Sequence, residues 1–145
     1  MAVDYSLPVR DAVMKALAAS ALGALVPVGS QYRGTVPVDR TFPFTRYGAP
    51  IAAPLLASGL DSSTIRFTVH SFTKPLTDGA GRVIRPAEDQ SHVIAAAIVA
   101  ALGDRILTLP DRTASVSWLT TNQLPDPQEA DVWHAVVSFS AGVTG

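Results

Sequence analysis

The sequence offers few side chains that could do acid–base or metal chemistry. It has no cysteine, and its three histidines are His70, His92 and His134. Zinc sites place histidines in short clusters or at i, i+4 spacing, and none of these three fits either pattern. His70 and His134 fall on predicted strands and can become neighbours across a sheet, with Asp131 or Glu88 as a carboxylate partner. The simpler interpretation is that they are solvent-facing strand histidines.

Carboxylates gather late in the chain, in a segment interrupted by prolines. Asp126, Glu129 and Asp131 lie within residues 121–131. A carboxylate pair can do acid–base work when burial raises one pKa, but a proline-containing loop offers little burial. The pattern therefore predicts a long, solvated acidic loop.

Nucleophilic and phosphate-binding motifs are also missing. No Gly-x-Ser-x-Gly elbow occurs, and Gly79-Ala80-Gly81 is only half of a dinucleotide-binding loop. We expect residues 74–85 to be a flexible excursion. The sequence predicts no catalytic residue, no cofactor and no metal.

Two segments have the apolar spacing of amphipathic helices. Residues 8–22 begin at an early proline, and Ser20 is placed to cap a short extra turn that ends near Leu25. Residues 87–102 follow Pro86 and carry acids in their first turn, which suits a helix N-terminus. Gly103 is expected to close this helix in the left-handed conformation.

Alternating apolar residues predict strands at 42–47, 63–72, 114–120 and 132–141. Residues 52–61 either extend the first strand or form a connecting arm. The last two strands are expected to form a long hairpin. Trp118 and Trp133 would then face each other, either in the core or as an exposed anchor for a partner.

Paired strands separated by helices predict an α+β fold. We expect one domain over residues 1–145, with long loops near 74–85 and 121–131. The sheet should be antiparallel and four-stranded or slightly larger, with the two main helices packed on one face. The predicted core consists of Leu17, Ile65, Phe67, Val69, Ile94, Ile98, Val137 and Phe139.

Composition limits the function further. The 145 residues carry a net charge of -1, which argues against a broad basic face for nucleic acid. Only 16% of residues are charged, and nine of the eleven basic residues are arginine, as interfaces or a GC-rich genome would favour. No apolar run reaches the roughly 18 residues of a membrane span, so no membrane partner is expected.

The order of these segments resembles the tail terminator, or tail-completion, proteins of long-tailed phages and gene transfer agents. The resemblance covers most of the chain and rests on the opening helix with residues 16–26, the Phe-Pro-Phe strand at 42–44, the strand at 65–72, the alanine-rich helix at 92–102 with residues 105–109 behind it, and the final strand at 134–141. The chain departs from the family pattern in a longer stretch at 51–62 and an insertion at 74–85.

The resemblance implies a mechanical role in the virion. Such proteins form a ring, usually a homohexamer, at the head-proximal end of the tail tube, where they stop tube growth and join the tail to the head connector. The expected partners are other copies of the chain, the tail-tube protein and the head-completion or stopper protein. DNA would pass through an acidic channel without specific binding. The expected location is the virion neck, after assembly in the host cytoplasm.

On this view the two long loops contact neighbours and become ordered only in the ring. Arg82 and Arg85 are expected to donate across subunits, and Asp126, Glu129 and Asp131 to accept or to line the channel. Two other interpretations remain open: a head-side stopper or minor tail-tube subunit, and a small enzyme that uses a histidine with a carboxylate.

Overall fold

The computed structural model describes residues 3–54 and 63–144. This part of the chain contains two α-helices, two short 3-10 helices and nine strands. In chain order these are α1 (Ser6–Ala19), η1 (Ala21–Ala24), η2 (Val28–Ser30), β1 (Gln31–Tyr32), β2 (Phe44–Tyr47), β3 (Ile51–Pro54), β4 (Ser63–Thr73), β5 (Leu76–Thr77), β6 (Val83–Arg85), α2 (Ala87–Leu102), β7 (Ile106–Thr108), β8 (Thr113–Pro125) and β9 (Trp133–Thr144). No helix of the described residues has the length and apolar character to cross a membrane.

Both helices form where local signals predict them, although α1 ends at Ala19 and not at the predicted Leu22. α2 has the predicted bounds, and α1 begins two residues earlier than expected, after Asp4 Oδ1 accepts hydrogen bonds from the Ser6 backbone N–H at 2.8 Å and from the Ser6 hydroxyl. Ser20 caps η1 by accepting from the Leu22 N–H at 3.2 Å, as predicted. The left-handed closure expected at Gly103 is wrong. Gly103 is extended with φ of -63°, and Asp104 takes the positive φ of 56°.

The sheet is larger and less uniform than predicted. Its strands run in the order β1-β2-β4-β9-β8-β7, and β3 also pairs with β4. β2 pairs with residues 69–72 of the long strand β4, and β3 pairs with residues 63–66. Both strands therefore lie along one edge of β4. The β1–β2 pair is parallel, which corrects the expectation of an antiparallel sheet of four strands or slightly more. Residues 33–43 connect these two parallel strands.

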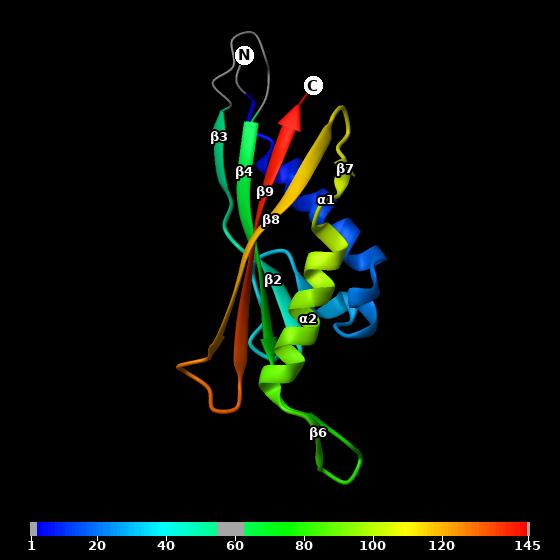
Figure 1. Ribbon diagram of the computed structural model, residues 1–145, viewed down its shortest axis with the longest axis vertical. Coiled ribbons are helices and arrows are strands. Elements are labelled where there is room, and N and C mark those ends of the chain that lie inside the picture. The colour runs from blue at the N-terminus through cyan, green and yellow to red at the C-terminus, as the bar shows by residue number, and fades with distance from the viewer. Residues whose placement is uncertain (1–2, 55–62, 145) are drawn as a thin grey trace.

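Alternation along β4 and β9 separates two faces of the sheet. The inner face carries the alternating buried side chains that share one core cluster with residues of α1 and α2. All eight predicted core residues are at most 2% exposed. Tyr47, Phe67 and Phe139 stack across this face with ring centroids 5.2 and 5.3 Å apart. Figure 1 shows α1 and α2 lying along the same side of the sheet.

Two segments expected as long loops contain strands instead. Within 74–85, β5 and β6 form a small separate hairpin, closed where Asp78 Oδ1 accepts from the N–H groups of Ala80 and Arg82, both at 2.9 Å. The excursion predicted here therefore contains a hairpin, and its flexibility stays a prediction. β8 continues to Pro125, so only residues 126–132 connect it to β9, and the loop predicted at 121–131 is shorter than expected.

The register of the β8–β9 hairpin rules out the expected tryptophan pair. β8 and β9 form the predicted hairpin, but their register shifts between Trp118 and Thr120. Trp118 lies opposite Phe139 and is 50% exposed, whereas Trp133 lies opposite Pro125 and is half-buried. The two tryptophans do not face each other. The register is regular from Ala114 to Trp118, so Trp118 lies on the same face of β8 as Val116, but beside Gly103 at the end of α2, where it stays exposed.

Of the stretch at 52–61, residues 52–54 belong to β3 and extend the sheet. Residues 55–61 lie outside the described residues.

Candidate functional site

The arginines expected at a subunit interface lie on the β5–β6 hairpin and make local contacts. Arg82 Nε is 3.3 Å from Asp78 Oδ2, and its side chain is 84% exposed. Arg85 Nη1 donates to Gln90 Oε1 at 3.0 Å, which ties β6 to the first turns of α2. Arg82 is therefore presented to solvent, while Arg85 helps to position the hairpin.

The three expected acceptors lie in the β8–β9 connection and differ in their surroundings. Glu129 is engaged within its own chain, because Oε1 accepts from Arg40 Nη2 at 2.9 Å and Oε2 lies 4.0 Å from Lys74 Nζ. Asp126 Oδ1 accepts from the backbone N–H of Gln128 at 2.8 Å. Asp131 is exposed with a positive φ of 64°. Of these three acids, Glu129 is thus the one that forms an ion pair with residues of its own chain.

The two cationic partners of Glu129 also cover an aromatic cluster on the outer face of the sheet, the face opposite the core. Phe44 stacks on Phe72 at a centroid distance of 4.8 Å, and Phe42 lies 5.2 Å from Phe44. The Arg40 guanidinium lies 5.5 Å from the Phe44 centroid, and Lys74 Nζ lies 4.5 Å from that of Phe42. Sequence analysis missed this cluster. The only available signal was that Phe42 and Phe44 are two residues apart in one predicted strand, and that another predicted strand carries Phe72.

The predicted approach of His70 and His134 is confirmed. Their Nδ1 and Nε2 atoms lie 2.7 Å apart on the outer face, and His70 Nε2 lies 2.9 Å from Thr68 Oγ1. Burial, with the positive charge of Arg46 second, lowers the pKa of His70 to about 4. The same two causes lower the pKa of His134. Both rings are therefore neutral near pH 7, and one ring donates the hydrogen bond while the other accepts it.

The carboxylate partners expected for this pair do not contact it. Asp126 acts on His134 only by partly opposing the lowering of its pKa, and the charge that affects both rings is the cation of Arg46. Within residues 3–54 and 63–144, no three histidine or acidic side chains gather in a way that could hold a metal ion. The geometry suits a neutral hydrogen-bonded pair.

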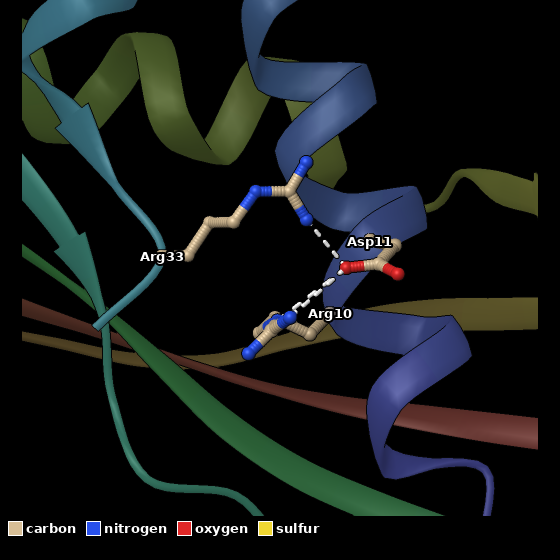
Figure 2. Close-up of polar contacts among 3 residues, drawn as sticks. All are labelled: Arg10, Asp11 and Arg33. Carbon is tan, nitrogen blue, oxygen red and sulfur yellow. Dashed lines mark hydrogen bonds and ion pairs between the residues drawn. The ribbon is translucent and has the colours of Figure 1, made fainter. Parts of the chain in front are cut away.

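A second polar cluster joins α1 to the residue that follows β1 (Figure 2). Asp11 Oδ1 accepts from Arg33 Nη1 at 2.5 Å and from Arg10 at 3.3 Å through Nη2. Figure 2 shows both guanidiniums turned toward this one carboxylate oxygen. Asp11 thereby holds two cations close together at the edge of the sheet.

These cations line a pocket of about 460 Å³ between the start of α1 and the turn after β2. Arg46 and Tyr47 contribute to the same wall. Tyr47 is 3% exposed, and its hydroxyl finds no hydrogen-bond partner among the described residues. Burial raises the pKa of Tyr47, opposed in part by the charge of Arg10. We call this hollow, walled by Arg10, Arg33, Arg46 and Tyr47, the basic pocket.

Sequence analysis missed the basic pocket because its residues come from three separate elements with no common spacing.

Two apolar side chains mark another hollow, of about 350 Å³, on the outer face. Ile51 on β3 and Leu119 at the register shift of β8 line it and are 71% and 45% exposed. Trp118 lies apart from this hollow, beside Gly103 at the end of α2.

The family model of the Tail completion protein gp17 matches residues 11–144. The chain belongs to this family. The resemblance drawn from the order of its segments is thereby confirmed. The matched range of this tail completion family member includes α2, all nine strands and the five residues expected at an interface.

A chain in the solved structure titled "Virion of native gene transfer agent (GTA) particle" shares the fold of this tail completion family member. The two superpose with a TM-score of 0.76 at 20% sequence identity, over 98% of this chain and 100% of the other. No curated protein matches the sequence.

Proposed function

We propose that this chain is a structural virion protein that forms a homohexameric ring at the head-proximal end of a long tail. The ring ends polymerisation of the tail tube and joins the tail to the head connector. The observation that carries the proposal is the family match over residues 11–144. The shared fold with a chain of a gene transfer agent virion supports it.

The surface of the chain suits a closed ring. A cyclic assembly with head-to-tail contacts needs two different patches on each subunit. The basic pocket lies at one edge of the sheet, beside the start of α1. Exposed acids lie at the other end of the molecule, on the first turn of α2 and in the β8–β9 connection, at the bottom of Figure 1.

The proposed partners follow from this role. Other copies of the chain complete the ring, the tail-tube protein lies below it, and the head-completion or stopper protein lies above it. DNA passes through the channel without specific binding, in keeping with the net charge of -1. The ring sits in the virion neck after assembly in the host cytoplasm, and its role is not enzymatic.

Electron microscopy of purified particles tests the position. With this chain carrying an epitope tag, antibody label should mark one ring per particle at the top of the tail. Particles produced without the protein should have overgrown tails or tails without heads. Label along stacked rings would identify a minor tube subunit, and label on tailless heads would identify a head-side stopper. Either result would overturn the proposal.

A triple variant addresses the remaining enzymatic interpretation. Replacing His70, His92 and His134 together with Gln should leave particle assembly nearly intact, because His70 and His134 hydrogen-bond to each other and His92 is an exposed surface residue. Loss of particle assembly while the variant remains folded would reopen the hypothesis of a histidine-dependent activity. His92→Gln alone is the control, since His92 is exposed on α2.

A further inference from the structure

We propose that the basic pocket of one copy binds carboxylate side chains at the acidic end of a second copy. By the acidic end we mean Glu88, Asp89 and Asp131, which are exposed on the first turn of α2 and in the β8–β9 connection. Cations also lie in this region, with Arg82 on the hairpin before α2 and Lys74 beside Glu129. The inference rests on the proposed ring, in which each subunit meets two neighbours through different patches. It names the chemistry of that contact.

The pocket presents donors in excess of acceptors. Each arginine carries five N–H donors and no acceptor. Arg10 and Arg33 share a single oxygen of Asp11, at 3.3 and 2.5 Å. The Tyr47 hydroxyl is buried in the pocket wall without a partner among the described residues.

The charge of the pocket selects an anion. Arg10, Arg33 and Arg46 bring three positive charges to its wall, and Asp11 returns one negative charge. A carboxylate or a phosphate matches a guanidinium through two parallel N–H···O bonds. A nucleic-acid backbone requires a row of such sites, whereas this pocket holds a single group and the whole chain has a net charge of -1. The carboxylate is the better match.

Glu88 and Asp89 at the start of α2 lie away from the pocket of their own chain. The start of α2 is held at the end of β4, where Thr73 Oγ1 donates to the Ala87 carbonyl at 2.8 Å. The pocket is held further up β4, where the Gly48 N–H donates to the Thr68 carbonyl at 2.7 Å. Thr68 and Thr73 are five residues apart, which is about 17 Å along a strand. Beyond Asp11, which already contacts Arg10 and Arg33, a carboxylate from the start of α2 can therefore enter this pocket only from a second molecule.

Two charge-reversed variants test the contact in the full chain. R10E/R33E makes the pocket negative, and E88R/D89R makes the acidic end positive. Each variant alone should self-associate at least about tenfold more weakly than the wild-type protein, because like charges then meet at the contact. An equimolar mixture should recover wild-type association, because the two variants can alternate with opposite charges at every contact. Native mass spectrometry measures the assemblies, and circular dichroism checks that each variant is folded.

A cross-link provides an independent measure that does not depend on charge. The chain has no cysteine, so introduced thiols have no native competitor. Gly34 lines the pocket and has open space at its Cβ position. Wild-type protein carrying G34C and E88C should form disulfide-linked multimers on mild oxidation. G34C with A96C is the matched control, because Ala96 is exposed on the same helix about 12 Å further along.

The outcomes separate this inference from the proposed ring. A ring that forms normally from R10E/R33E, or equal cross-linking in both cysteine pairs, overturns the carboxylate contact and leaves the ring in place. Loss of binding to a 30-base-pair DNA duplex by R10E/R33E, with assembly unchanged, assigns the pocket to phosphate instead. Label found away from the tail top overturns the proposed function, whereas the cross-link still reports on the contact itself.

Discussion

His70 and His134 form a direct hydrogen bond of 2.7 Å between Nδ1 and Nε2 on the outer face of the sheet. The bond requires at least one neutral ring, and the pKa of His70 is about 4 in the folded protein against an ordinary value of 6.5. The unfolded chain therefore binds more protons between these two values. The stability that depends on this pair is therefore fully present above pH 6.5, and the free energy of unfolding decreases as the pH falls toward 4.

This relationship predicts an acid-sensitive midpoint of unfolding. Between pH 7 and 4.5 the pair should account for a loss of about 1–2 kcal/mol, after allowance for partial exposure of the two rings. Urea unfolding at a series of pH values measures the loss. H70Q/H134Q should flatten this part of the profile, and H92Q should retain the wild-type slope. An unchanged slope in the double variant would contradict the prediction.

Gly48 leaves no room for a side chain. A Cβ at this position would lie 1.8 Å from Thr68 Oγ1 and 2.9 Å from His70 Nε2. Gly48→Ala should lower the free energy of unfolding by about 1–3 kcal/mol. Gly34→Ala is the matched control, because a Cβ added at Gly34 would meet nothing within 4 Å.

Thr68→Ala tests the cause of that effect, because it removes the nearer of the two clashing atoms. Adding Gly48→Ala to Thr68→Ala should cost at least about 0.5 kcal/mol less than Gly48→Ala costs in the wild-type protein. Equal costs in the two backgrounds, measured by urea unfolding, would show that the clash lies elsewhere.

Ile98 tests the core between α2 and the sheet. Its side chain is 0% exposed, so Ile98→Ala should destabilise the fold by about 2–5 kcal/mol, and Ile98→Asp should yield insoluble protein because an unpaired charge would enter the core. Val93→Ala, on the same helix but at a position 37% exposed, should change stability far less. Thermal unfolding and the soluble fraction of expressed protein measure these effects.

The β5–β6 hairpin is expected to act in assembly and not in folding. It forms a separate two-stranded sheet, so replacing residues 74–85 with a tight turn should leave the main sheet folded. Particles made with this variant should have overgrown tails or tails not joined to heads. Arg82→Ala, which removes only the exposed cation, is the milder control. Normal tail lengths in the shortened variant would exclude a role for the hairpin.

Much of the fold followed from local sequence patterns. α2 has its predicted bounds because proline, first-turn acids and apolar spacing all act within the helix itself. Ile65, Phe67 and Val69 are buried as their alternation predicted. Ser20 caps η1 through a hydrogen bond to Leu22, only two residues further along the chain. In each case the deciding interaction joins residues close in sequence, so a single segment contains the necessary information.

The remainder depended on contacts between distant segments. Strand pairing and contacts between distant segments set the parallel β1–β2 pair, the hairpin register that separates Trp118 from Trp133, and the contact of Arg40 with Glu129. Only the tertiary structure brought Arg10, Arg33 and Tyr47 around one pocket. Periodicity in the sequence tells which side of its own element a residue occupies. Which elements meet there is decided by packing of the whole core, and the charge and hydrogen-bonding capacity of the pocket exist only after that packing.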